Sequence, residues 1–153
     1  MSRLEVIAHL KVRPGQLDAF KKQAAELVRL ANEQDTGTLR YDWFLSRDGT
    51  ECEVHEAYES SESMMEHAAH IAEARNTMFA EYAEDHVVKV FGEPSPQFFA
   101  MVEGMQKAGH VKVTWFSFLQ GLESPARVRN SEARVLKNNW WPVADLPNQR
   151  GIP

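Results

Sequence analysis

The sequence predicts an α+β protein with the ferredoxin-like element order βαββαβ, extended by one further helix and one further strand. Two observations predict this order. Apolar and polar residues alternate in short runs separated by turn residues, which is typical of strands with one buried face. Between the first two runs, and again before the fourth, apolar residues recur at the spacing of an amphipathic helix.

The first predicted strand spans Leu4–Val12, where every second residue is apolar. Pro14-Gly15 ends this strand and opens a helix, because proline suits the first helical turn. We expect the helix to end near residues 32–34, before Gly37. Its apolar stripe consists of Leu17, Phe20, Ala24, Leu27 and Ala31.

The next two strands are predicted over Leu39–Leu45 and Cys52–Tyr58, because apolar and polar residues alternate in both runs. Arg47-Asp48-Gly49 lies between them and has the composition of a hairpin turn. These two strands should therefore pair with each other directly.

A second helix follows, and Ser60 or Ser61 is expected to cap its first turn. Its stripe consists of Met64, His67, Ala68, Ile71, Ala74, Met78 and Tyr82. We expect a kink or split near Arg75-Asn76, and a fourth strand over Val87–Phe91.

The chain continues with a predicted helix over Pro96–Lys107 and a strand over Val111–Leu119. This strand is expected to extend the sheet or to reach a partner subunit, because unpaired strand edges invite pairing. Residues 1–122 are assigned to one domain, since a chain of 153 residues suits a single core. Residues 123–153 have weak periodicity and form a tail, either a poorly ordered extension or an arm that docks on the body or a partner.

The composition restricts the partners. The formal charge is −5, so nothing favours nucleic acid or an anionic membrane, and a small molecule is the more natural ligand. The sequence has no apolar run long enough to span a membrane and no signal peptide. Cys52 is the single cysteine, which excludes an intrachain disulfide and a cysteine-based metal site. We therefore expect a cytoplasmic protein.

His67 is the leading candidate for a catalytic base. It falls in the apolar stripe of the second helix, where a neutral imidazole can accept a phenolic proton at neutral pH. The alternative is a core histidine bonded to a backbone carbonyl. His70 follows three residues later, as a pocket residue or a partly exposed helix residue. The pair does not form the His-Glu-x-x-His metal signature, so no metal is expected.

Tyr41 and Trp43 project from one face of the second strand, about 7 Å apart by strand geometry. They either stack on a ligand ring and donate a hydrogen bond, or pack in the core or a dimer interface. The sheet face that they occupy decides between these alternatives.

Four other residues complete the candidate pocket. Glu56 shares a strand face with apolar neighbours, so it should either pair with an arginine such as Arg40 or assist a histidine. His9 on the first strand is a pocket residue or an exposed histidine. Ile71 and Phe79 on the second helix are expected in the pocket wall or the core.

The block "GTLRYDWFLSRDG" (residues 37–49), the run "EAYES" (residues 56–60) and the histidine-bearing helix after it resemble the antibiotic biosynthesis monooxygenase family, which includes quinol monooxygenases. The resemblance covers about Leu4 to Gly92, and "VTWFSFLQGL" (residues 113–122) is similar to the closing strand of some members. It departs from many members at "HAAHIAEARNTMF", which lacks their Ser/Thr-Pro-His-Phe run.

This resemblance implies a dimeric α+β barrel, in which two sheets pack across a dyad and each subunit keeps a cleft. It also implies oxidation of a quinol, anthrone or other small phenol by O₂ without metal, flavin or other cofactor. Such chemistry needs aromatic walls, one base and hydrogen-bond donors for the developing oxyanion. His67, Tyr41 and Trp43 would supply these as the catalytic set.

Three alternatives stay open because the fold does not determine the function. An isomerase of a small carbonyl compound would use His67 and Glu56 to shuttle a proton. Haem-degrading relatives rely on an asparagine in the first strand, and "LEVIAHLKV" contains none. A non-catalytic ligand-binding or stress-response dimer would have an apolar pocket, with His67 tied to the backbone.

Overall fold

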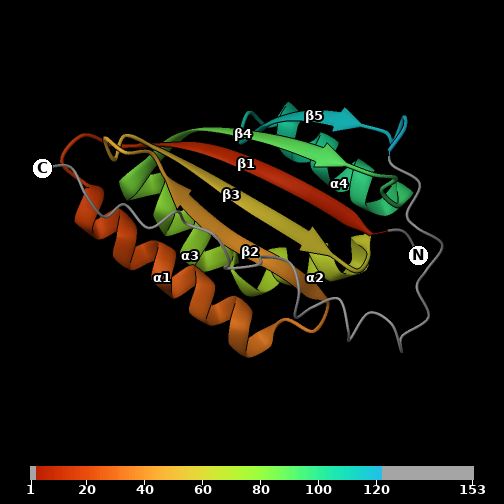
Figure 1. The fold of residues 1–153 in the computed structure, drawn as a ribbon, viewed down its shortest axis with the longest axis horizontal. Helices are drawn as coiled ribbons and strands as arrows, with labels where there is room; N and C mark the ends of the chain where they lie inside the picture. Colours follow the sequence, from red (N-terminus) through yellow and green to blue (C-terminus); the bar gives the residue numbers. More distant parts are fainter. Residues whose placement is uncertain (1–2, 122–153) are drawn as a thin grey trace, which may run out of the picture. The chain divides into compact units, whose positions relative to one another are not determined.

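A five-stranded sheet with helices packed against it forms the body of the protein (Figure 1). The structure, a computed structural model, describes residues 3–121. The elements are β1 (Leu4–Val12), α1 (Leu17–Gln34), β2 (Thr38–Leu45), β3 (Glu51–Tyr58), α2 (Ser61–His70), α3 (Ala72–Thr77), the π-helix η1 (Met78–Tyr82), β4 (Ala83–Phe91), α4 (Pro96–Lys107) and β5 (Lys112–Phe116). The predicted α+β class, with one added helix and strand, is confirmed.

The strands lie in the order β2-β3-β1-β4-β5. The pairs β1–β3, β1–β4 and β2–β3 are antiparallel, which is the arrangement of a ferredoxin-like sheet. β5 pairs with β4 in parallel, because α4 carries the chain back along the sheet between them. The predicted fifth strand therefore extends this sheet within the subunit, although it ends at Phe116 and not at Leu119.

The two faces of the sheet differ. Leu4, Val6 and Ala8 of β1 are buried on the face that packs against the helices. From α1, Phe20 and Leu27 join the same core. The side chains that alternate with these on the strands lie on the opposite face, which no element of residues 3–121 covers.

The second helical region differs from the prediction. Ser60 caps α2, as expected, since its hydroxyl accepts a hydrogen bond from the backbone N–H of Ser63. The predicted break near Arg75-Asn76 is wrong, because the chain breaks at Ile71, which ends α2 and precedes α3. Ile71 has φ −93° and ψ 0°, outside the helical range, and this turn keeps its side chain buried.

β4 begins at Ala83, four residues before the predicted Val87. Glu84 pairs with Lys11 of β1, and a bulge between His9 and Lys11 shifts the register there. Asp85 has a φ of 55°, a value that fits this irregularity. Charged residues at a bulge have no regular alternation, so the sequence pattern did not include them in the strand.

Of the described residues, 3–118 form one compact unit. The predicted tail, residues 123–153, lies outside the described part of the chain. No helix within residues 3–121 is long and apolar enough to cross a membrane.

Candidate functional site

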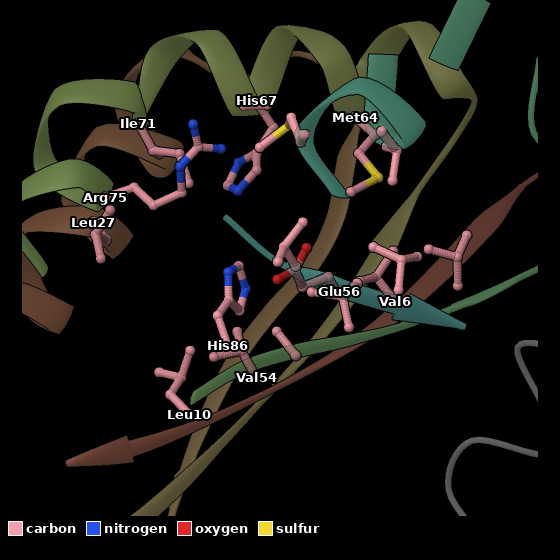
Figure 2. A pocket seen from close by; sticks show the side chains of 18 of the residues that line it. Val6, Leu10, Leu27, Val54, Glu56, Met64, His67, Ile71, Arg75 and His86 are labelled. Carbon is pink, nitrogen blue, oxygen red and sulfur yellow. The ribbon is translucent and has the colours of Figure 1, made fainter. Parts of the chain in front are cut away.

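A cavity of about 120 Å³ lies between the covered face of the sheet and the helices (Figure 2). Most of its lining is aliphatic or aromatic. Its ionisable groups, apart from the Tyr41 phenol, are the side chains of Glu56, His67, Arg75 and His86. Figure 2 shows His67 and Arg75 reaching in from the helix side, and Glu56 and His86 from the sheet side. The aliphatic and thioether lining includes Val6, Ala8, Leu10, Leu27, Val54, Met64, Ile71, Met78, Val88, Val90, Met101 and Met105.

Asp35 binds both histidines of α2. Its Oδ2 lies 2.6 Å from Nδ1 of His67, and its Oδ1 lies 2.8 Å from Nδ1 of His70. Thr38 donates a third hydrogen bond to this carboxylate, at 2.8 Å. The histidines reach one carboxylate because residues three apart lie on the same side of a helix.

These hydrogen bonds determine which nitrogen of His67 carries the proton. Burial alone would raise the pKa of Asp35, but the bonds from His70, His67 and Thr38 outweigh it and lower that pKa. Burial of His67, which is 3% exposed, lowers the pKa of its imidazole against the raising effect of Asp35. A neutral imidazole beside an ionised carboxylate must donate from Nδ1, so Nε2 is an acceptor. Nε2 has no hydrogen-bond partner within residues 3–121.

Two local features bring Asp35 to α2. Asp35 follows the last residue of α1, and its backbone N–H still donates to the carbonyl of Ala31. Gly37 is the second feature, because a Cβ atom at this position would lie 2.6 Å from the Cβ of Ser63. Only glycine lets the loop approach α2 this closely, and the approach carries Asp35 to the histidines.

Aromatic side chains form the wall beside His67. The Tyr41 ring stands nearly perpendicular to the His67 ring, with centroids 4.6 Å apart, and Trp43 packs edge-on against Tyr41 at 5.7 Å. Both therefore occupy the helix face of the sheet and line the cavity. The Nε1 of Trp43 is buried and has no hydrogen-bond acceptor within residues 3–121. Burial raises the pKa of Tyr41 well above its usual value.

Glu56 lies across the cavity from His67 and accepts a hydrogen bond of 2.6 Å from the Tyr58 hydroxyl. Burial raises the pKa of Glu56 to about 7, against the lowering effects of Tyr58 and Arg75. The predicted pairing of Glu56 with Arg40 is wrong. Arg40 alternates onto the opposite face, where it binds Asp42 at 2.9 Å.

A second group of side chains lies at the η1 and β4 side of the cavity. His86 stacks on Phe79 with ring centroids 4.3 Å apart, and burial lowers the pKa of His86 to about 4. Arg75 of α3 directs its guanidinium into the cavity beside His67 (Figure 2). At neutral pH, His86 is therefore neutral and Arg75 is charged.

Six of the eight predicted site residues line this one cavity: Tyr41, Trp43, Glu56, His67, Ile71 and Phe79. The structure corrects the expected position of the other two. His9 lies on the opposite face of the sheet, 3.7 Å from both Glu51 and Glu53, because β1 alternates. His70 faces Asp35, and its side chain is 26% exposed.

The sequence interpretation missed Asp35 and His86, and noted Arg75 only as a possible kink. The one signal for Asp35 was the His67–His70 pair, whose spacing favours a shared partner. That partner is the Asp35 carboxylate. In the part of the chain that the structure describes, no three His, Cys, Asp or Glu side chains are arranged to hold a metal ion.

Several solved structures share the fold. MupZ from Pseudomonas fluorescens is similar with a TM-score of 0.64 at 19% identity, covering 84% of this chain and 100% of MupZ. Rv0793 from Mycobacterium tuberculosis has a TM-score of 0.53 at 25% identity, covering 61% of this chain and 97% of its own. A Nitrosomonas europaea protein, provisionally described as an antibiotic biosynthesis monooxygenase, has a TM-score of 0.53 at 23% identity. The match covers 61% of this chain and 92% of the Nitrosomonas europaea chain.

The fraction of this chain that each solved structure covers differs between the three matches. The similarity to MupZ extends over more of this chain than the other two, which fits α4 and β5 being additions to that unit. No curated protein matches the chain. The family model for antibiotic biosynthesis monooxygenase matches residues 3–87, more than half of the chain, which therefore belongs to this family.

Proposed function

We propose that the protein is a cofactor-independent monooxygenase that oxidises a quinol or another small phenol with O₂. One observation carries the proposal. His67 is buried and neutral, and Asp35 holds its Nδ1 so that Nε2 is an unpaired acceptor at an aromatic-walled cavity. If the protein were a non-catalytic binding protein, we would expect His67 to bond to the backbone. The partner of His67 is instead the side-chain carboxylate of Asp35.

In the proposed first step, Nε2 of His67 removes the proton of the substrate hydroxyl. The Asp35 carboxylate stabilises the imidazolium that forms, since it already accepts the Nδ1 proton at 2.6 Å. The product of this step is a phenolate, which is far more easily oxidised than the phenol. Trp43 Nε1 is a buried donor without an acceptor, so a small turn of its ring would let it donate to the negative oxygen.

In the second step, the phenolate gives one electron to O₂, and the two radicals combine to form a carbon–oxygen bond. Proton transfer and cleavage of the O–O bond then release water. For a quinol, the sum is quinol plus O₂ giving hydroxyquinone plus water, and each product receives one of the two atoms of O₂. The electrons come from the substrate, so this balance needs no external reductant. The apolar lining keeps bulk water from the intermediates.

The size of the cavity favours a single aromatic ring. Its volume of about 120 Å³ is close to that of engineered cavities, about 150 Å³, that bind benzene. A tricyclic anthrone would need α4 or the helical segments to move outward. A one-ring quinol is therefore the preferred substrate within the phenol class.

Oxygen uptake tests the proposal. Purified protein, treated with chelator and free of flavin, is mixed with one-ring quinols in an oxygen electrode beside His67→Gln and His110→Gln. His110 is an exposed histidine outside the cavity, so His110→Gln is the matched control. We expect uptake above the autoxidation blank for wild type and the control, and none for His67→Gln because glutamine is not a base. Equal uptake by all three proteins would refute His67 as the base.

An isomerase is the second candidate, because Glu56 has a pKa of about 7 and faces His67 across the cavity. A carboxyl group that titrates near neutrality can move a proton between two carbons of a carbonyl compound, with the His67 imidazole as its partner. The same assay separates the two functions. Isomerisation would continue under nitrogen, whereas monooxygenation would stop.

We also propose that the protein is a cytoplasmic homodimer that pairs through the open face of the sheet. Phe44 and Phe116 are 51% and 41% exposed on that face, and large exposed aromatic groups mark interaction surfaces. Light scattering should give twice the mass of one chain. We expect Phe44→Glu to shift the protein toward monomer, while a wild-type protein at single-chain mass would disprove the dimer.

A further inference from the structure

The guanidinium of Arg75 lines the cavity, and it makes no hydrogen bond or ion pair with another group of residues 3–121. Its guanidinium points into a space whose lining is largely apolar, as Figure 2 shows. A guanidinium has five N–H donors, and the half-buried side chain of Arg75 leaves them open to a ligand. A side chain in this position is suited to an anion that enters from outside.

The other arginines of the described segment are bound or lie on the surface. Arg13 donates to the carbonyl oxygens of Phe79 and Ala83, at 3.0 and 3.1 Å. Arg3, Arg29 and Arg40 pair with acidic side chains. Arg47 is exposed in the β2–β3 turn. Arg75 alone among them lines the cavity beside the proposed base.

We propose that Arg75 binds a carboxylate of the substrate, so that the ligand is a one-ring phenol or quinol bearing an acid group. A carboxylate matches the planar donor fork of arginine with two parallel hydrogen bonds. The phenolic part of this assignment rests on the proposed function, whereas the acid group rests on Arg75 itself.

The charges around the cavity fit an anionic ligand. His86 and His67 are neutral at pH 7, since burial lowers the pKa of both imidazoles. Glu56 has a pKa of about 7, so it is mostly protonated at pH 6. When Glu56 is protonated and both imidazoles are neutral, Arg75 is the one charged group of the cavity lining, and an acid that binds there neutralises it.

The positions of the two groups orient the ligand. His67 lies on α2 and Arg75 on α3, and both enter the cavity from the helix side (Figure 2). With its carboxylate on Arg75, a ring between the helices and the sheet presents its hydroxyl to His67. Tyr41 and Trp43 lie beside His67 and contact the ring.

Calorimetry under nitrogen at pH 6 tests this inference with two probes, 2,5-dihydroxybenzoate and its neutral amide. The protein is studied as wild type, Arg75→Gln, Arg75→Lys and Arg47→Gln. We expect wild type and Arg47→Gln to bind the acid about tenfold to a hundredfold more tightly than the amide. Arg75→Gln should lose this preference, and Arg75→Lys should keep part of it because the charge is retained.

Equal binding of acid and amide by wild type would overturn the inference, as would a preference that survives in Arg75→Gln or the binding of neither probe. Urea unfolding of each variant shows that a lost preference does not reflect a lost fold. Nitrogen keeps binding separate from turnover. A preference for the acid without oxygen uptake in air would refute the monooxygenase function and support the anion site at Arg75. Oxygen uptake with neutral quinols alone would support the monooxygenase function and refute the anion site.

Discussion

Replacing Asp35 with asparagine is expected to lower the turnover number for the phenol about a thousandfold while the protein stays folded. Asparagine has the same shape, but its amide carries one acceptor oxygen where the carboxylate has two. His67, His70 and Thr38 all bind that carboxylate in the native protein. An amide NH₂ facing Nδ1 of His67 would move the ring proton to Nε2, and the base would lose its acceptor.

Two measurements and a control variant separate this positioning role from a structural one. Steady-state oxygen uptake should show a fall in kcat with little change in KM, because the cavity walls are unaltered. Nitrogen NMR of the imidazole should show the proton on Nδ1 in wild type and on Nε2 in Asp35→Asn. Asp42→Asn is the matched control, since Asp42 lies on the open face and binds Arg40. Wild-type turnover in Asp35→Asn would leave Asp35 with a structural role only.

Replacing Glu56 with glutamine is expected to raise the free energy of unfolding by roughly 3 kcal/mol at pH 9 and to change it little at pH 4.5. The reason is the pKa of Glu56, about 7 in the folded protein against the usual 4.5. An acid whose pKa is raised by folding favours the folded state while it is protonated. That stability is lost as the pH rises from 4.5 through 7, because the folded state must then ionise a buried carboxyl group.

Glutamine stays neutral and can still accept the hydrogen bond from the Tyr58 hydroxyl. Urea unfolding at half-unit steps from pH 4.5 to 9 should therefore show a difference that grows up to pH 7 and then levels off. Glu81→Gln is the control, because Glu81 is exposed on η1. If the free energies of unfolding of wild type and Glu56→Gln differed by a constant amount across this range, the pKa of Glu56 would be the same in the folded and the unfolded state.

The element order followed from the sequence because alternation and helical spacing are local properties. Leu4–Val12 alternates without a fault, and the structure confirms that strand at both ends. The structure differs from the predicted elements where packing or a bulge outweighs the local sequence pattern. The chain turns at Ile71 to keep its side chain in the core, and β4 begins inside a charged run at a bulge.

The sequence also determined part of the site. His67, Tyr41, Trp43 and Glu56 all lie at the same cavity. Helical spacing places His67 on the apolar stripe of its helix, and alternation places Tyr41 with Trp43, and Glu56 with Tyr58, on one face of a strand. Periodicity cannot state which face of the sheet the helices cover. Alternation puts His9 on the polar face of β1, and only the structure shows that this face is the open side of the sheet.

Only the tertiary structure decided what surrounds the base. Asp35 lies 32 residues before His67 in the chain, at the end of a different helix, and meets it because Gly37 lets the two segments approach. Arg75 and His86 enter the same cavity from other elements for the same kind of reason. The local sequence pattern indicates on which face of its own helix or strand each side chain lies. The partner of a charged group depends on packing between elements, which no spacing within one segment encodes.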